Sequence, residues 1–369
     1  MANSPSPTAC PRQIAENDWS IELLRGLAAL MVVYAHYRVF GGAPPSVLDF
    51  SFSGVDLFFV ISGFVFAPYF YGKKLDIGPF FIRRLLRIYP LYVVALGLYA
   101  ALRHVNGQGV EHLLEHLLFL HTLKSKEIAF YYNPAFWSLP PEVEFYLVLP
   151  ALCTLFRGER RVGILVALAG LTHLGLVAAL SGSDGTNRAV EISMFHLPGV
   201  LAEFLLGTLA WRAALLQPRS AIRGLLLLAG GTLWATLAVI FMRGGDAAIE
   251  SSWWLRGNVG ILSALAYALV VAALVGWIKT APPALRAASL WIGNLSFGIY
   301  LFHNAMPIAL SPFVEAPSGA LFATACTAGT LILSYLAHCF WEEPLRQWGR
   351  KQAKQMQART PCRRHRMNG

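Results

Sequence analysis

One apolar run near the N-terminus carries two ionisable residues, and it constrains the fold more than any other feature. The run extends from Ser20 to Phe40 and contains Arg25 and His36. It is long enough to cross a bilayer only if both polar residues enter with it. An arginine at the centre of a membrane helix costs about 2.5–3.5 kcal/mol, so such residues usually face a bundle interior. The alternative is that Arg25 marks one end of the helix and His36 the opposite interface.

The spacing of these two residues places them on nearly one helical face. They are 11 positions apart, which is about three turns and roughly 16 Å along the helix axis. One face of this helix could therefore line two levels of a shared cavity.

Composition independently predicts a membrane protein. Of the 369 residues, 56% are hydrophobic and 14% are charged, and the mean hydropathy is +0.52. A chain this apolar is expected to use the lipid bilayer as its solvent. The net charge of +10 lies in short clusters between apolar runs rather than in one stripe, so no nucleic-acid partner is expected. The five cysteines show no paired spacing and predict neither a disulfide framework nor a zinc site.

The apolar runs predict an all-α polytopic bundle of about ten transmembrane helices. Each run has about 20 residues, as a bilayer requires. We expect an N-terminal tail over residues 1–18, a transmembrane domain over 19–345 and a basic tail over 346–369, disordered after Trp348. The runs begin near Trp19, Ser51, Phe80, Trp137, Val162, His196, Ala221, Gly257, Ala288 and Gly319.

Basic clusters between alternate spans predict the orientation. All five would fall on one face, which the positive-inside rule makes cytoplasmic, so both termini are expected inside a cell inner membrane. Loops near residues 181–188, 243–252 and 311–318 would then face outward. The clusters are Lys73/Lys74 with Arg83/Arg84/Arg87, Arg157/Arg160/Arg161, Arg212/Arg219/Arg223, Lys279/Arg286, and the tail from Arg346 to Arg366.

The segment 110–121 is amphipathic and too short to span, which favours an interfacial or re-entrant helix on the outer side. His112 and His116 are four positions apart and could bind a metal with His121. The acidic residues precede the histidines, however, unlike the HExxH arrangement. We therefore expect a polar face at the level of the lipid headgroups and no metal site.

The sequence of residues 137–150 predicts the start of a membrane helix. Ser138 is a plausible N-cap, and Pro140 and Pro141 suit the first turn. Glu142 would sit near the positive end of the helix dipole. Complementing that dipole is worth about 0.3–1 kcal/mol, which is a sufficient structural reason for a carboxylate there.

Polar side chains also mark three other predicted spans. Arg83, Arg84 and Arg87 stand at the mouth of the third span, where they either signal topology or bind phosphate oxygens with their guanidinium forks. In the second span, Asp56 and Ser62 allow a polar pocket, and Ser62 with Gly63 favours close helix packing.

Five motifs follow one another along the chain, namely Arg25 with His36, Asp56–Phe64, Arg83–Pro90, Trp137–Glu142 and Ser296–His303. Together they resemble the membrane-bound acyltransferase 3 family over nearly the whole chain. The resemblance implies an integral-membrane O-acyltransferase. Such an enzyme would move an acyl group, most simply acetyl, from acetyl-CoA or another acyl-CoA on the cytoplasmic side to a hydroxyl. The acceptor would be a carbohydrate, a lipid-linked glycan or a small molecule.

The resemblance also implies catalytic roles. His36 would act as general base or carry the acyl group as a relay, and Arg25 would steady the donor's charge or the developing oxyanion. Glu142 matches the family's glutamate and would orient the imidazole or stabilise its cation. This chain departs from the commoner pattern with two prolines before Glu142 and Val143 after it, which leaves Glu144 as a lesser alternative.

Binding roles follow from the same resemblance. Arg84 and Arg87 match the family's R-x-x-R element and, with Arg83, would hold the donor's phosphates. Ser62 is a further pocket candidate. Ser296, Tyr300 and His303 step along one face of the ninth span, and His303 either lines the cavity or is a satisfied core histidine. The alternative function is a transporter or flippase that uses the intramembrane Arg, His and Glu as a substrate or proton path. Coenzyme A dependence separates the two functions.

Overall fold

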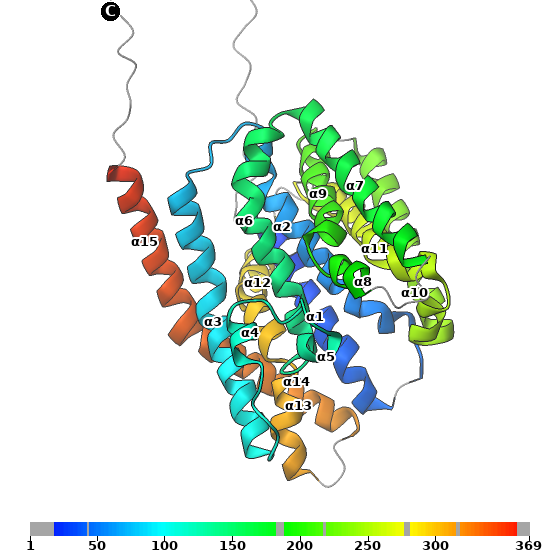
Figure 1. Cartoon of the computed structure of the whole chain (residues 1–369), viewed down its shortest axis with the longest axis vertical. Coiled ribbons are helices and arrows are strands. Elements are labelled where there is room, and N and C mark those ends of the chain that lie inside the picture. The colour runs from blue at the N-terminus through cyan, green and yellow to red at the C-terminus, as the bar shows by residue number, and fades with distance from the viewer. Residues whose placement is uncertain are drawn as a thin grey trace, which may run out of the picture.

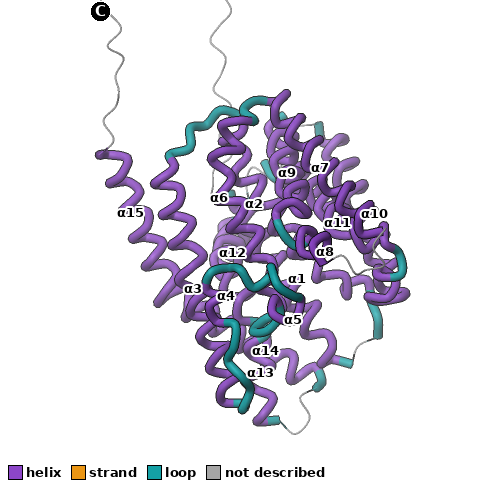
Figure 2. Tube along the Cα trace, viewed as in Figure 1, coloured by secondary structure: helices purple, strands orange, loops and turns teal. Residues whose placement is uncertain are grey.

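Helices make up every regular element of the computed structural model, which describes residues 18–42, 44–181, 188–216, 219–276, 281–314 and 318–359 (Figures 1 and 2). No strand occurs among these residues, and the predicted all-α bundle is confirmed. The longer helices are α1 (Trp19–Gly41), α2 (Gly54–Phe70), α3 (Ile77–Val105), α6 (Leu139–Leu155), α7 (Glu159–Ser181), α9 (Leu197–Leu215), α10 (Ser220–Glu250), α11 (Trp253–Leu274), α12 (Pro283–Phe302), α14 (Ala320–Ala337) and α15 (Glu343–Arg359). The shorter ones are η1 (Val47–Ser53), α4 (Leu113–Leu117), α5 (Lys126–Ala129), η2 (Pro134–Ser138), α8 (Arg188–Met194), α13 (Ala305–Leu310), η3 (Ser311–Phe313) and η4 (His338–Glu342).

Within the described ranges, eight helical stretches are long and apolar enough to cross a membrane. The expected spans near Trp137 and Ala288 are not among the eight. They form α6, with 17 residues, and α12, with 20 residues. Helix α6 is shorter than the about 20 residues that a crossing needs, and α12 carries Arg286 and Asn294 among its apolar residues. Both belong to the bundle, because α6 packs on α2 and α9 while α12 packs on α1.

Capping residues, Asp18 at the N-terminus and Gly42 at the C-terminus, define the two ends of helix α1. The side chain of Asp18 accepts a hydrogen bond of 2.9 Å from the backbone N–H of Ser20, which satisfies one of the free donors of the first turn. Gly42 ends the helix with a φ of 60°. A Cβ added to Gly293 of α12 would lie 2.6 Å from Cβ of Glu22. Helix α1 therefore lies flush against α12.

Helices α2 and α9 cross with their backbones in contact. A Cβ added to Gly63 would lie 1.7 Å from the carbonyl oxygen of Phe204, and one added to Gly207 would lie 1.9 Å from that of Val60. Only glycine permits this approach, so the packing role expected of Gly63 is confirmed. The ring of Phe145 from α6 stacks on Phe204, with 4.3 Å between centroids. The largest part of the core lies at this junction.

The C-terminal region differs from its prediction. We expected disorder after Trp348, which is wrong for the described residues because α15 continues to Arg359 and packs along α3 (Figure 1). The side-chain amide of Gln357 donates a hydrogen bond of 2.8 Å to Asp76, at the start of α3. Several expected features lie outside the described ranges: residues 1–17 of the N-terminal tail expected over 1–18, the loop residues 182–187 and 315–317, Lys279, and residues 360–369.

The predicted helix over 110–121 is wrong in extent, because only Leu113–Leu117 is helical. His112 and Phe119 flank this single turn with φ values of 59° and 57°. These left-handed conformations interrupt a right-handed helix on both sides. The segment between α3 and α6 is therefore mostly irregular.

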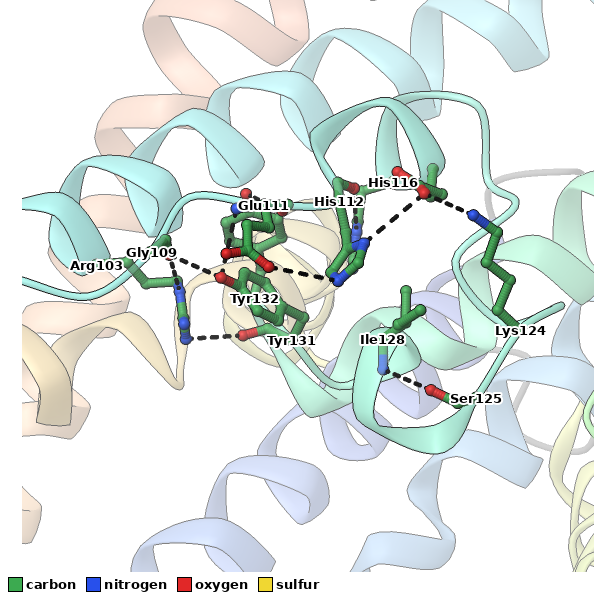
Figure 3. Close-up of polar contacts among 11 residues, drawn as sticks. Arg103, Gly109, Glu111, His112, His116, Lys124, Ser125, Ile128, Tyr131 and Tyr132 are labelled. Carbon is green, nitrogen blue, oxygen red and sulfur yellow. Dashed lines mark hydrogen bonds and ion pairs between the residues drawn. The ribbon is translucent and has the colours of Figure 1, made fainter.

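Polar contacts hold this segment in place (Figure 3). The Arg103 guanidinium donates a 2.9 Å hydrogen bond to the carbonyl oxygen of Gly109, and the Tyr131 hydroxyl donates one of 2.8 Å to the same oxygen. Lys124 forms an ion pair with Glu115 at 2.9 Å. The two hydrogen bonds satisfy the carbonyl oxygen of Gly109, which has no helical partner here, and the ion pair joins two side chains of the segment.

Two histidines of this segment are buried rather than at a polar face. His116 and His121 are both 0% exposed, and their rings stack with 4.2 Å between centroids. Burial disfavours the charged form, so it lowers the pKa of His116 to about 4 and that of His121 to about 3. His116 Nδ1 bonds to the carbonyl oxygen of His112 at 2.9 Å. No group of three or more metal-ligating side chains occurs among the described residues.

Candidate functional site

A cavity of about 740 Å³, counting its open side, lies between α1, α2, α3, α6 and α12. Its walls are largely aromatic and aliphatic side chains, among them Phe58 and Phe66. An apolar pocket with a few convergent polar groups is the usual form of a small-molecule site. Six of the residues predicted for the site line it, namely Arg25, Ser62, Arg84, Arg87, Glu142 and Tyr300.

Glu142 is held at the cavity by two hydroxyl groups. Its carboxylate accepts a hydrogen bond of 2.9 Å from Ser62 of α2, and a second from Tyr146 one turn further along α6. The predicted capping bond from Ser138 is absent, because its hydroxyl instead lies 2.7 Å from that of Tyr300. The position of Glu142 therefore depends on α2 and on its own helix.

Arg25 enters the cavity with a carboxylate partner that sequence analysis missed. Its guanidinium forms an ion pair of 2.5 Å with Glu22, one turn earlier on α1, and both side chains are largely buried. A buried arginine is tolerated when a carboxylate offsets its charge. The i, i+3 spacing was visible in the sequence, so helical periodicity could have identified this pair.

An arginine-rich vestibule adjoins the cavity. It encloses about 1,610 Å³, including its open side, and shares Arg25, Val65, Arg84 and Arg87 with the cavity. Arg83 lines only the vestibule. The remaining arginines of its lining, Arg346 and Arg350, come from α15, which sequence analysis had assigned to the basic tail.

Arg84 stands at the junction of the two spaces. Its guanidinium carbon lies 4.7 Å from the ring centroid of Phe66 and 5.8 Å from that of Tyr146. Stacking on aromatic faces is a geometry that guanidinium favours over ammonium. The two rings thus fix the direction in which Arg84 points.

His36 and His303 lie together but do not line the cavity. Their ring centroids are 4.8 Å apart at an angle of 64°. His36 Nδ1 lies 2.9 Å from the carbonyl oxygen of Val32, and His303 Nδ1 lies 2.8 Å from that of Tyr300. In each ring Nδ1–H is the donor, which leaves Nε2 as the proton acceptor. Arg25 therefore lines this cavity, whereas His36 and His303 are not among its lining residues.

Glu142 does not bond to His36. Its carboxylate accepts hydrogen bonds from Ser62 and Tyr146, whereas the ring of His36 packs against His303. The predicted orienting role of Glu142 consequently has no direct contact to support it.

A second glutamate and histidine pair was missed by sequence analysis. Glu144 of α6 accepts from His196 Nδ1 at 2.5 Å and from the backbone N–H of Leu197 at 2.9 Å. Because Glu144 and His196 belong to different helices, no local spacing signalled the pair.

A buried carboxyl pair joins α2 and α9. Asp56 and Glu203 are within hydrogen-bonding contact of each other, and a Cβ added to Gly260 of α11 would lie 2.8 Å from Glu203 Oε1 and 3.6 Å from Asp56 Oδ1. Two ionised carboxylates in contact repel each other, so this pair is an unusual feature inside a helical bundle. Sequence analysis could have found Glu203 as an acidic residue within a predicted span.

Comparison of the sequence with known proteins relates this chain to acyltransferases. A family model described as an acyltransferase domain matches residues 18–339. Nodulation protein 10 of Rhizobium leguminosarum bv. viciae is 28% identical over 320 residues, which cover 77% of this chain and 81% of that protein. A protein of Staphylococcus aureus (strain COL), provisionally named as an O-acetyltransferase, is 24% identical over 89% of this chain, which spans only 57% of that protein's length. A provisionally named acetyltransferase of Acidianus two-tailed virus is 25% identical over 78% of this chain and 83% of its own length. No solved structure matches the chain.

Proposed function

Because the chain belongs to the acyltransferase 3 family, we propose that it is a membrane O-acyltransferase that uses acyl-CoA. It would move an acyl group, most simply acetyl, to a hydroxyl of a carbohydrate, a lipid-linked glycan or a small glycosylated molecule. The provisional names of the Staphylococcus aureus and viral relatives, an O-acetyltransferase and an acetyltransferase, support acyl transfer. The donor, the acceptor and the cytoplasmic location of the donor are parts of the proposal.

One observation supports this proposal: the arginine vestibule adjoins the cavity that Glu142 lines, and the two share Arg25, Arg84 and Arg87. Coenzyme A carries a diphosphate and a ribose phosphate, which guanidinium groups bind well. Its thioester lies at the end of a flexible arm. With the phosphates in the vestibule, that arm would reach into the apolar cavity, where the reaction is shielded from water.

The reaction requires one nucleophilic substitution. The acceptor oxygen attacks the thioester carbonyl carbon, the C–S bond breaks, and the hydroxyl proton passes through a base to the leaving coenzyme A thiolate. We assign the base to His36, whose Nδ1 bonds to the carbonyl oxygen of Val32 and whose Nε2 can accept a proton. Because the ring of His36 packs on His303 outside the cavity lining, the acceptor hydroxyl would have to approach the thioester from the side of this histidine pair. Arg25 would stabilise the oxyanion that develops on the carbonyl oxygen. Glu142 would act by accepting the hydrogen bonds of the Ser62 and Tyr146 hydroxyls. It is also the alternative base, because its carboxylate lines the cavity.

Replacing Arg84 and Arg87 with alanine tests the donor site. We expect a loss of acetyl-CoA affinity of about tenfold or more, because each truncated fork removes charge-assisted hydrogen bonds. Lysine at both positions should restore only part of the affinity. Calorimetry on the purified protein in detergent measures the dissociation constants.

The matched control replaces Arg160 and Arg161, two exposed arginines that do not line the vestibule. This control should bind acetyl-CoA as the wild type does. If the well-folded Arg84/Arg87 double variant binds acetyl-CoA with unchanged affinity, those arginines only orient the helix in the membrane. The proposal that the vestibule binds the donor would then be wrong.

A further inference from the structure

Helix α15 supplies a separate group of arginines to the vestibule. Arg346 and Arg350 project from α15, whereas Arg83, Arg84 and Arg87 project from α3, which α15 packs along (Figure 1). The vestibule therefore has basic side chains on two helices that are far apart in sequence.

The α15 arginines are held in place by acidic neighbours. Arg350 forms an ion pair with Glu343 at 2.6 Å, and Arg346 contacts Glu343 at 3.8 Å and Glu342 at 3.4 Å. Glu343 thus bridges both guanidinium groups. Such bridging fixes flexible side chains before any ligand arrives, which lowers the entropy cost of binding.

The charges of the vestibule do not cancel. Its lining contains six arginines against two glutamates, Glu22 and Glu343. Adding Glu342, which contacts Arg346 at the edge, still leaves an excess of three positive charges. A concave surface with this excess attracts a polyanion rather than a single carboxylate.

The arginines fall into two levels. Arg25, Arg84 and Arg87 line both the cavity and the vestibule, so they lie at the junction. The α15 pair lines only the vestibule, further from the cavity that would receive the thioester. In coenzyme A, the diphosphate lies between the thioester arm and the adenosine, and the ribose phosphate lies on the adenosine beyond it.

We propose that Arg346 and Arg350 of α15 bind the ribose 3′-phosphate of the donor while Arg84 and Arg87 at the junction bind its diphosphate. This assignment rests on the proposed use of acyl-CoA. It makes α15 the element that distinguishes coenzyme A from otherwise identical donors that lack the third phosphate.

Binding of coenzyme A and dephospho-coenzyme A to the purified full chain tests the assignment. The wild type should bind coenzyme A about tenfold more tightly than dephospho-coenzyme A, because the latter leaves the α15 arginines without their anion. R346Q/R350Q should bind coenzyme A as weakly as the wild type binds dephospho-coenzyme A, and its affinity for dephospho-coenzyme A should be unchanged. R84A/R87A should bind both ligands more weakly than the wild type does.

Two further variants guard against a folding artefact. R350Q alone alters a half-exposed side chain and should show part of the same selective loss. K351Q removes an exposed charge of α15 outside the vestibule and should bind both ligands normally. Equal wild-type affinities for the two ligands, or an equal loss of both in R346Q/R350Q, would overturn the assignment.

The outcome is separable from that of the proposed function. Selective binding of coenzyme A without any acyl transfer from acetyl-CoA would retain the α15 assignment and reject the enzymatic proposal. Acyl transfer that proceeds equally well from acetyl-CoA and acetyl-dephospho-coenzyme A would reject the α15 assignment and retain the enzyme.

Discussion

Glu142 and Glu144 lie two positions apart on α6, and their side chains end in different surroundings. Glu142 meets Ser62 at the cavity, whereas Glu144 binds His196 at the start of α9. The motif identified Glu142 but left Glu144 as an alternative, and only the packing of α6 between two helices separates them. The partner of Glu144 could not be predicted, because a pairing 52 residues apart leaves no local pattern.

At the same scale, the buried pair His116 and His121 predicts a pH-dependent stability. Burial lowers the pKa of these side chains to about 4 and about 3, against about 6.5 in the unfolded chain. Below pH 6.5 the unfolded chain takes up protons that the folded chain does not. The contribution of the pair to the free energy of unfolding is therefore fully present above about pH 6.5. It is lost as the pH drops toward 4, which lowers the free energy of unfolding by a few kcal/mol, to an order of magnitude.

Thermal unfolding in detergent at pH 7.5 and pH 5 measures this loss. Glu115, whose hydrogen bond to Lys124 lowers its pKa to about 2, titrates below this window and does not contribute to it. The variant H116Q/H121Q should lose less stability between the two pH values than the wild type. Identical losses in the two proteins would show that the pair does not control the acid response.

At the scale of elements, apolar length predicted most helices correctly because lipid-facing and buried segments both require it. Apolar length failed as a predictor where tertiary packing or backbone conformation determines whether a helix forms. Helix α15 is polar, so its helicity comes from packing along α3, a contact that composition does not reveal. The segment 110–121 has a helical pattern, but left-handed residues at His112 and Phe119 stop the helix after one turn.

The crossing of α2 and α9 predicts that Gly63→Ala and Gly207→Ala are strongly destabilising. Each new methyl group would overlap a carbonyl oxygen of the facing helix and force the backbones apart, which costs about 1–3 kcal/mol or more. A lowered unfolding temperature in detergent reports the effect. Gly170→Ala on α7 is the control, since no atom lies within 4 Å of its added Cβ. Equal stability of all three variants would contradict the close crossing.

At the scale of the whole molecule, the vestibule and the basic clusters should share the cytoplasmic face, with the segment between α3 and α6 outside. Single cysteines probe this orientation. A cysteine at exposed Asp246 should react with an impermeant reagent added to intact cells, whereas one at exposed Lys74 should react only after permeabilisation. The opposite labelling pattern would invert the proposed topology and move the donor site to the outer face.

We propose that this bundle transfers an acyl group from acyl-coenzyme A with His36 as the base. The most direct measurement follows labelled acetyl from acetyl-CoA into acceptors in membranes that contain the expressed chain, and identifies the product by mass. We predict transfer by the wild type, a fall of about 10²–10⁴-fold in H36N, and a small residual rate in E142Q. Wild-type transfer by a well-folded H36N variant would contradict the account and shift the search for the base to Glu142 and His303.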